Sequence, residues 1–260
     1  MIQDIIDTHT HLCDSGFDDD RTEVVERAKQ SGVVSIIAVG ETLEDAQKNI
    51  RLAKQYPEIH PAAGLYPAHL DFQKAEEIIL FIRKHQNDLI AISEVGLDFW
   101  IAKTDEEREI QKEIFKKFIE LSRELNLPLN IHSRSAGKHV IPLLLEHNAQ
   151  KVQLHAFDGK ASTALTAVEA GYYFSVPPSI VRSRQKQKLV KQLPLSCLLV
   201  ETDSPVLGPT PGKRNEPANI VYSVKAIADI KGMKKEEIIE ACYNNTIKLY
   251  GKFSELKTNR

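Results

Sequence analysis

Two histidines separated by a single residue, His9 and His11, stand near the start of the chain. They follow an apolar run over residues 2–6 that predicts a strand. Alternate side chains of a strand point to the same face and lie roughly 6.6 Å apart along it, so both imidazoles would face the same way. Imidazole nitrogen is a common ligand of divalent ions, and this pair is close enough to bind one cation. Two unrelated histidines are the alternative, because a bare His-x-His motif is weak.

Four further side chains of ligand type stand at the ends of later apolar segments. They are Glu94, His132, His155 and Asp203, and each ends or nearly ends a segment that is typical of a buried strand. The carboxyl ends of the strands in a parallel barrel meet on one rim, so four imidazoles and two carboxylates would converge there. Their repulsion and loss of solvation would be costly unless cations bound among them. Six independently solvated residues are the alternative.

A mixed set of imidazoles and carboxylates suits a pair of divalent ions, with Mg, Mn or Zn as candidates. Two-metal sites hold their ions about 3.5–4 Å apart and contact both the attacking and the leaving oxygen of a displacement. Glu94, which is central in strand order, could bridge the two ions. Asp203 could bind one ion and take a proton from water, because divalent metals lower the pKa of bound water to around 7. The predicted chemistry is hydrolysis, with Glu94 and Asp203 as catalytic residues.

Regularly alternating elements must position these residues. Apolar segments and helical segments alternate eight times along the chain, which indicates parallel strands joined by helices. Eight such units in about 250 residues predict a (β/α)8 TIM barrel of the α/β class with an extra C-terminal helix, as one domain over residues 1–260. A doubly wound open sheet is the alternative. The expected strands are residues 2–6, 33–39, 60–65, 88–95, 127–132, 151–155, 171–175 and 197–203. The expected helices are residues 20–30, 41–56, 72–86, 104–125, two that end at 147 and 170, then 182–192, 217–230 and 234–250.

The composition excludes a strong general attraction to polyanions. The chain has 34 basic and 36 acidic residues and a formal net charge of −2, so nucleic-acid binding must come from local placement of charge. No apolar run approaches the ~18 residues of a membrane span, and we find no pattern typical of a signal peptide. The three cysteines are scattered, which is typical of reduced thiols in a cytoplasmic protein.

Five short motifs contain the predicted ligands and are spread over nearly the whole chain. They are DTHTHL at residues 7–12, EVGLD at 94–98, IHSR at 131–134, HAFDG at 155–159 and ETDSP at 201–205. By these motifs and their order the chain resembles the TatD-related deoxyribonucleases, which are amidohydrolase-type metal-dependent hydrolases. Residues 175–180 and 214–217 are most similar to the third animal paralogue of that family.

This resemblance implies a TIM barrel that hydrolyses phosphodiester bonds with divalent metal ions, as a 3′→5′ exonuclease on the 3′ end of single-stranded DNA. It implies that one ion is held by His9, His11, Glu94 and Asp203, and the second by Glu94, His132 and His155. Water or hydroxide held by the metals would attack phosphorus in line with Asp203 as base, and Arg134 would help to offset the growing charge. Two alternatives stay open: hydrolysis of a C–N or ester bond in a small molecule, and a non-catalytic binding protein on a degenerate barrel.

One position departs from the family pattern. Where the family usually carries Gly-x-His-Pro, this chain has the segment GLYP at residues 64–67, so Tyr66 replaces a histidine that the family places near the substrate phosphate. A phenol donates a hydrogen bond but carries no charge at pH 7. His69, three residues on, could substitute for the missing imidazole. The resemblance therefore makes both residues candidate substrate contacts, and the departure bears on rate and substrate preference more than on metal binding.

Residues near the predicted strand ends are candidate partners of the phosphate or of the ligands. Arg134 follows His132 by two residues, and a guanidinium there would bind a phosphate bidentately; a solvent-facing or capping arginine is the alternative. Asp98 could orient a ligand histidine as a hydrogen-bond acceptor. Phe99 and Trp100 could stack on a terminal base, although packing within a lid is the simpler interpretation.

A basic run begins the predicted helix after the seventh strand, and its members are Arg182, Arg184, Lys186 and Lys188. Such a run is usually a solvated face, but its N-terminal members, Arg182 above all, could line the rim and attract a polyanion. Lys213 and Arg214, in the loop after the eighth strand, have the same two interpretations. The remaining histidines are expected at the surface, away from the site: His60, His85, His139 and His147.

Overall fold

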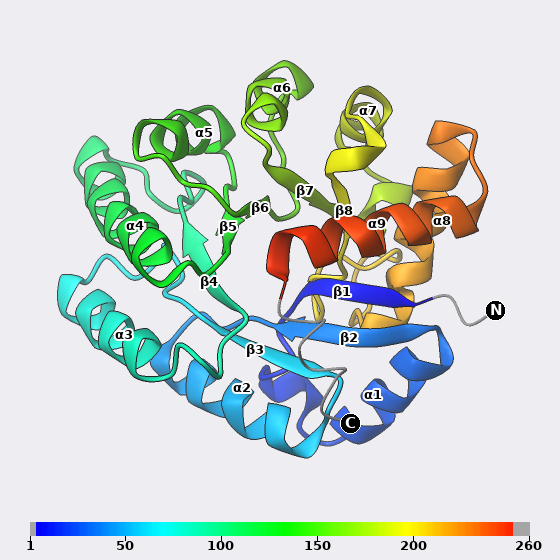
Figure 1. Ribbon diagram of the computed structural model, residues 1–260, viewed down its shortest axis with the longest axis horizontal. Helices are drawn as coiled ribbons and strands as arrows, with labels where there is room; N and C mark the ends of the chain where they lie inside the picture. The colour runs from blue at the N-terminus through cyan, green and yellow to red at the C-terminus, as the bar shows by residue number, and fades with distance from the viewer. Residues whose placement is uncertain (1–3, 252–260) are drawn as a thin grey trace.

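Eight strands form one parallel sheet in sequence order, and helices surround it (Figure 1). The structure is a computed structural model that describes residues 4–251. The strands are β1 Ile5–Thr10, β2 Val33–Ala38, β3 Ile59–Ala63, β4 Ala91–Gly96, β5 Leu129–His132, β6 Val152–Leu154, β7 Tyr173–Val176 and β8 Leu198–Val200. The expected first strand began at Ile2, which lies outside the described residues, as do the ends of the expected domain at residues 1–3 and 252–260. Within them β1 runs on to Thr10 and contains His9.

The first and last strands of the sheet meet, so the sheet closes into a barrel. Beyond the end of β8, the backbone N–H of Asp203 donates to the carbonyl of His9 over 2.8 Å, and His11 N–H donates to the carbonyl of Ser204 over 2.8 Å. Every sequence-adjacent strand pair from β1 to β8 is parallel. The predicted TIM barrel is therefore confirmed, and the doubly wound open sheet is excluded.

The helices begin and end close to the predicted positions. They are α1 Arg21–Gln30, α2 Leu43–Gln55, α3 Phe72–Lys84, α4 Asp105–Leu125, α5 Gly137–Glu146, α6 Ala161–Glu169, α7 Arg184–Gln192, α8 Ile220–Lys231 and α9 Lys235–Tyr250, with short 3-10 segments at Ser15–Phe17, Pro178–Val181, Leu195–Cys197 and Pro217–Asn219. The helix predicted from Pro217 thus starts with a 3-10 turn, and its α-helical part begins at Ile220. The extra C-terminal helix is α9.

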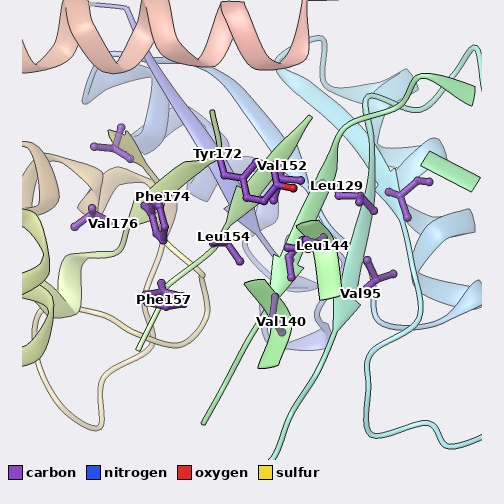
Figure 2. Close-up of a cluster of buried hydrophobic side chains, with 14 of the residues drawn as sticks. Val95, Leu129, Val140, Leu144, Val152, Leu154, Phe157, Tyr172, Phe174 and Val176 are labelled. Carbon is purple, nitrogen blue, oxygen red and sulfur yellow. The ribbon is translucent and has the colours of Figure 1, made fainter. Parts of the chain in front are cut away.

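Apolar side chains pack on both faces of the strands. The larger cluster lies between strands and helices, and Figure 2 shows part of it, with Leu144 of α5 beside Leu154 of β6. A smaller cluster fills the barrel interior and includes Leu249 and Tyr250, the last residues of α9. One end of α9 therefore closes the barrel from the side away from the predicted site, which leaves the carboxyl ends of the strands open.

His60 is buried rather than at the surface, so that prediction was wrong. It is 7% exposed, and its Nε2 lies 3.3 Å from Ser35 Oγ. Alternation along β3 places His60 on the same face as Ala62, which belongs to the interior cluster. The side chains of the other three histidines in that prediction are partly exposed. Each of the three cysteines is buried with a free thiol, and none of the described helices is both long and apolar enough to cross a membrane.

Candidate active site

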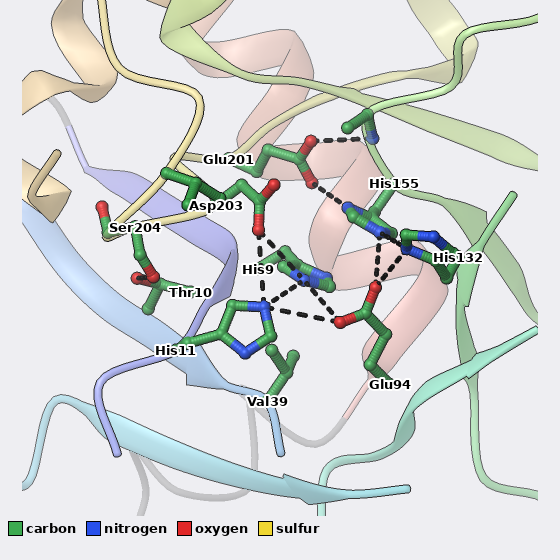
Figure 3. Close-up of polar contacts among 12 residues, drawn as sticks. His9, Thr10, His11, Val39, Glu94, His132, His155, Glu201, Asp203 and Ser204 are labelled. Carbon is green, nitrogen blue, oxygen red and sulfur yellow. Dashed lines mark hydrogen bonds and ion pairs between the residues drawn. The ribbon is translucent and has the colours of Figure 1, made fainter. Parts of the chain in front are cut away.

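The six side chains predicted as metal ligands lie together where the strands end (Figure 3). His9 belongs to β1, Glu94 to β4 and His132 to β5, whereas His11, His155 and Asp203 lie in the segments after β1, β6 and β8. All are buried except His11, which is partly exposed. The structure therefore brings the predicted residues to one rim, and their role as ligands stays a prediction.

The first group of atoms gathers around the imidazole of His11. Its Nε2 lies 3.3 Å from Nε2 of His9, 3.4 Å from Asp203 Oδ1 and 3.4 Å from Glu94 Oε2. His9 Nε2 lies 3.6 Å from the same oxygen of Asp203. Two imidazole nitrogens and two carboxylate oxygens thus point toward one small volume, which is the donor set that a divalent ion prefers.

The second group gathers around the other carboxylate oxygen of Glu94. Oε1 lies 2.6 Å from His132 Nδ1 and 2.8 Å from His155 Nε2, and these two nitrogens are 3.2 Å apart. His155 also stacks on His9, with ring centroids 3.9 Å apart and an angle of 9° between the planes. The two oxygens of Glu94 therefore face different groups of nitrogens, as a carboxylate that bridges two ions would.

The atoms fall into three compact groups that differ in detail from the expected division. Within the described residues, the ligand atoms of His9, Glu94 and His155 lie within 4.8 Å of one another, as do those of His9, His11 and Asp203, and those of His11, Glu41 and Glu94. Glu41, just beyond β2, was assigned to a helix by the sequence analysis and is a new member. Its position after an apolar strand was the signal that could have identified it.

Hydrogen bonds on the outer side of the rings fix which nitrogen faces the site. His9 Nδ1 donates to Asn130 Oδ1 over 2.9 Å, which leaves the lone pair of Nε2 directed at His11. His132 Nε2 lies 3.0 Å from Asp98 Oδ2, in agreement with the predicted role of Asp98. These supports leave nitrogen lone pairs free for cations, so the residues present fit bound divalent ions.

Two supporting residues were missed by the sequence analysis. Asn130 stands two residues before His132, and Glu201 stands two residues before Asp203. Glu201 Oε2 lies 4.0 Å from His155 Nδ1, and Oε1 accepts a hydrogen bond from the backbone N–H of Ala156 over 2.8 Å. The signal for Asn130 was the two-residue period of a strand, which puts it on the same face as His132.

The pKa values of the buried groups are shifted in opposite directions. Burial, followed by the neighbouring His155, lowers the pKa of His9 to about 3, so this ring is neutral. Burial alone would lower the pKa of His132, but Glu94 and Asp98 outweigh it and raise that pKa to about 10. Burial opposes ionisation of Glu94, yet His132 and His155 hold its pKa well below the ordinary value. Without metal, protons therefore supply part of the positive charge that cations would supply, and metal binding must displace them.

A pocket of about 400 Å³ opens over these groups. Its lining comprises His11, Glu41, Tyr66, Glu94, His132, Ser133, Arg134, His155, Ala156, Asp158, Lys186, Asp203, Val206 and Leu207. Of the residues predicted to contact substrate, Tyr66 and Arg134 line it. His69, Arg182 and Arg214 are not among its lining residues, whereas Lys186, predicted as part of a basic run, is.

Tyr66 is hydrogen-bonded to Asp98, the residue that contacts the predicted ligand His132. Its hydroxyl donates to Asp98 Oδ2 over 2.8 Å, and its ring meets that of His132 edge to face with centroids 5.0 Å apart. His69, the expected substitute, contacts Tyr66 through the backbone, where its N–H donates to the Tyr66 carbonyl over 3.0 Å. Tyr66 therefore donates a hydrogen bond to the carboxylate that also contacts the His132 ring, and it lines the pocket.

The predicted arginines lie in three different environments. Arg134 is exposed at the pocket, with its guanidinium carbon 5.0 Å from the centre of the Trp100 ring. Arg182 is exposed, and its Nε donates to the carbonyl of Gly208 over 3.4 Å. Arg214 forms an ion pair with Asp20, with Nη2 and Oδ2 2.5 Å apart. Arg134 is thus the one of these three that the structure places beside the predicted ligands.

The aromatic residues after β4 differ from each other. Phe99 is buried, and its ring centroid lies 4.9 Å from that of His139, so it packs inside the protein. Trp100 is 57% exposed, and Lys103 Nζ lies 4.9 Å from its ring centre. Since Arg134 also lies over this ring, the indole is already engaged by two cations.

Comparisons with known proteins agree with this geometry. A family model described as TatD related DNase matches residues 6–251. The human protein named deoxyribonuclease TATDN3 is 45% identical over 264 residues, which cover 97% of this chain and 96% of that protein. A Bacillus subtilis protein named uncharacterized metal-dependent hydrolase YabD is 35% identical over 255 residues, which cover 95% of this chain and 98% of that protein. The crystal structure of YJJV, a TatD homologue from Escherichia coli, superposes with a TM-score of 0.89 at 27% identity and covers 96% of this chain and 99% of that one.

Proposed function

The chain belongs to the family of TatD-related deoxyribonucleases, and from this premise we propose that it removes nucleotides from the 3′ end of single-stranded DNA with the help of two divalent ions. The observation that carries the proposal is the convergence of four imidazoles and two carboxylates on one rim, where His11, Glu94, His132, His155 and Asp203 line the pocket. The family membership supports a metal-dependent hydrolase that acts on DNA. The polarity of cleavage and the number of ions are the parts that we add.

We assign the six residues to two ions that share Glu94. His9, His11, Glu94 and Asp203 would hold one ion, and Glu94, His132 and His155 would hold the other. The two carboxylate oxygens of Glu94 support this division, because they face His11 and the pair of His132 and His155 respectively. Bound divalent ions would supply the positive charge that phosphodiester hydrolysis requires and would favour ionisation of water. Mg, Mn and Zn are the candidate ions.

The chain's own residues would perform the remaining steps. The Asp203 carboxylate, whose pKa His11 holds below the ordinary value despite burial, would accept the proton of the attacking water. The Arg134 guanidinium at the rim would donate to a phosphoryl oxygen as charge develops there. Asn130 and Asp98 would keep the rings of His9 and His132 in place.

The test is cleavage of labelled oligonucleotides by protein that has been freed of metal and reloaded with Mg, Mn or Zn. With single-stranded DNA labelled at the 5′ end we expect a ladder that shortens one nucleotide at a time, and with 3′-labelled DNA immediate release of the label. EDTA should stop both reactions. Glu94→Gln should be inactive, whereas His147→Asn, a histidine outside the site, should behave as the wild type.

Each part of the proposal has its own contrary result. Release of the 5′ label first would overturn the polarity. Faster cleavage of a matched RNA would overturn the assignment of DNA as substrate. If no nucleic acid is cleaved with any of the three ions while an ester or amide is hydrolysed, the small-molecule alternative is correct. A single ion per chain in the fully active protein, measured by atomic emission, would overturn the two-ion assignment.

A further inference from the structure

One lysine of the basic run at the start of α7 is buried. Lys186 is 9% exposed, whereas Arg182, Arg184 and Lys188 are exposed. The helix begins after Ser183, whose Oγ accepts from the backbone N–H of Lys186 over 3.3 Å. This cap fixes the rotation of α7, and one turn on from Lys186 the side chains of Leu189 and Val190 are buried. An ammonium group therefore stands on the packed face of the helix.

The ammonium group of Lys186 lies at the pocket above the predicted metal ligands. Nζ donates to the carbonyl of Ala156 over 2.7 Å, and Ala156 directly follows His155. Lys186 lines the same pocket as His155 and Asp203. Burial lowers the pKa of Lys186, and three carboxylates that act on its charge without a hydrogen bond to Nζ oppose this effect. An ammonium has three donors, and one of them is used by Ala156.

The three nearby carboxylates are engaged elsewhere. Glu201 accepts from Ala156 N–H and from Ser175 Oγ, the latter over 2.5 Å. Asp158 accepts from the backbone N–H of Ser135 over 2.9 Å. Asp203 lies 3.4 Å from His11 and belongs to the predicted ligand set. A buried charge is costly without a hydrogen-bonded counter-ion, and an anion in the pocket that Lys186 lines could accept from the remaining donors of Nζ.

We propose that Lys186 binds a phosphate oxygen of the substrate from the side of the pocket formed by His155 and Asp203. The proposal rests on the proposed function, since a phosphodiester would be the anion, and it adds a second cationic contact to the one expected from Arg134. The two contacts differ in kind. Arg134 is exposed and already lies over Trp100, whereas Lys186 is held in place by its helix cap and by Ala156. A fixed ammonium can form a charge-assisted hydrogen bond to a phosphate oxygen without first having to be ordered.

If Lys186 had only a structural role, its substitution would have a different effect from the loss of a phosphate contact. The neighbouring Gln185 also contacts the loop between β6 and α6, with Nε2 donating to the carbonyl of Gly159 over 2.8 Å. If Lys186 only anchored this loop, its loss would resemble the loss of Gln185. Gln185→Ala is therefore the matched control for anchoring, and Lys191→Gln, an exposed lysine of the same helix, is the control for net charge.

The experiment measures binding of inorganic phosphate to the Mg-loaded protein by isothermal titration, with metal content and melting temperature recorded for each variant. Lys186→Gln should weaken phosphate binding by about tenfold or more, which is the loss expected for one charge-assisted hydrogen bond. Lys186→Arg, Gln185→Ala and Lys191→Gln should remain within about threefold of the wild type on the same scale. Equal phosphate affinity in Lys186→Gln and the wild type, at equal metal content, would overturn the proposal.

Two further measurements keep this inference separate from the proposed function. In the wild type, NMR of the lysine side chains should show the Lys186 Cε–Nζ signals shifting as phosphate is added, which requires no variant to fold; unmoved signals would contradict the proposal. Cleavage of single-stranded DNA is assayed in parallel. Absence of cleavage by the wild type counts against the proposed function, whereas Lys186-dependent phosphate binding in that same protein would still support the phosphate contact.

Discussion

The Nε2 atoms of His9 and His11 lie 3.3 Å apart, each on a ring that extends from the same face of the first strand and its continuation. Because His9 Nδ1 donates to Asn130, the Nε2 atom of His9 carries a lone pair and not a proton. The facing nitrogen of His11 must then either bring a proton or share a cation with it. Burial lowers the pKa of His11, but the carboxylates of Asp203 and Glu94 outweigh it and raise that pKa to about 9. His11 is therefore protonated when no metal is bound, and a divalent cation would take the place of that proton between the same carboxylates.

Removal of metal should therefore lower the thermal stability of the protein. An ion at 100 times its dissociation constant stabilises the folded state by about 2.7 kcal/mol, and this corresponds to about 5–10 °C in melting temperature for a chain of this size. Differential scanning calorimetry with and without EDTA measures the shift. His11→Asn should reduce it, and His147→Asn should leave it unchanged. An EDTA-treated protein that melts at the temperature of the metal-loaded one would exclude ions from this site.

Glu94→Gln should abolish turnover while the protein stays folded. The substitution keeps the size of the side chain but removes the charge that faces both groups of imidazoles, and we expect a loss of about 10³-fold or more, comparable to the loss of a main electrostatic contribution. Circular dichroism checks the fold and atomic emission counts the ions. Glu41→Gln is the comparison, because Glu41 borders the same pocket but would affect at most one ion. Full activity in Glu94→Gln would remove this residue from the mechanism.

Much of the fold and the convergence of the six residues could be predicted from the sequence, because both depend on short-range patterns. Alternating apolar and amphipathic segments indicate a barrel, and a two-residue period puts His9 and His11 on one face. The environment of Lys186 could not be predicted in this way. Its neighbours along the chain are glutamines and basic residues, and only the packing of α7 against the loop after His155 buries it.

The segment after β8 illustrates a second limit of sequence reasoning. The expected strand continued to Asp203, but β8 ends at Val200. Asp203 has a positive φ of 55°, a backbone conformation that residues other than glycine rarely adopt. Its backbone N–H donates to the carbonyl of His9. The backbone of β1 therefore fixes where Asp203 lies, through a contact between residues almost two hundred positions apart that no local pattern records.

Asn130→Ala should weaken metal binding by about 10–100-fold, the usual cost of losing a residue that orients a metal ligand. Asn130 accepts from His9 Nδ1, and its amide also donates to the carbonyl of Thr8 over 2.8 Å. Competition with a chromophoric chelator measures the affinity. Gln153→Ala is the control, since Gln153 bonds to Thr8 and Tyr250 but not to His9. We expect it to lower stability and to leave metal affinity within about threefold; equal losses of affinity in both variants would refute the orienting role.

Tyr66→Phe should reduce kcat/KM by less than Asp98→Ala does. The hydroxyl of Tyr66 is one of several donors to Asp98, whose carboxylate also accepts from the backbone N–H groups of Trp100 and Ile101 and contacts His132. Loss of one hydrogen bond to a charged group corresponds to about 1.5–3 kcal/mol, whereas loss of Asp98 frees the His132 ring. Initial rates on a labelled oligonucleotide, with metal content measured in parallel, make the comparison. A larger loss in Tyr66→Phe would mean that the phenol contacts the substrate directly.

Gly96→Ala should destabilise the protein more than Gly171→Ala. Both glycines have positive φ values, 143° and 83°, so each alanine carries a conformational cost of about 1–2 kcal/mol. A Cβ on Gly96 would also lie 2.1 Å from the carbonyl oxygen of His132, the residue that it pairs with across β4 and β5. The described residues place no atom within 4 Å of a Cβ on Gly171. Relief of the clash requires the two strands to separate near two predicted ligands, at a total cost on the order of 3 kcal/mol or more. Urea denaturation measures both variants, and equal midpoints would show that the β4–β5 pair yields to the added methyl group without strain.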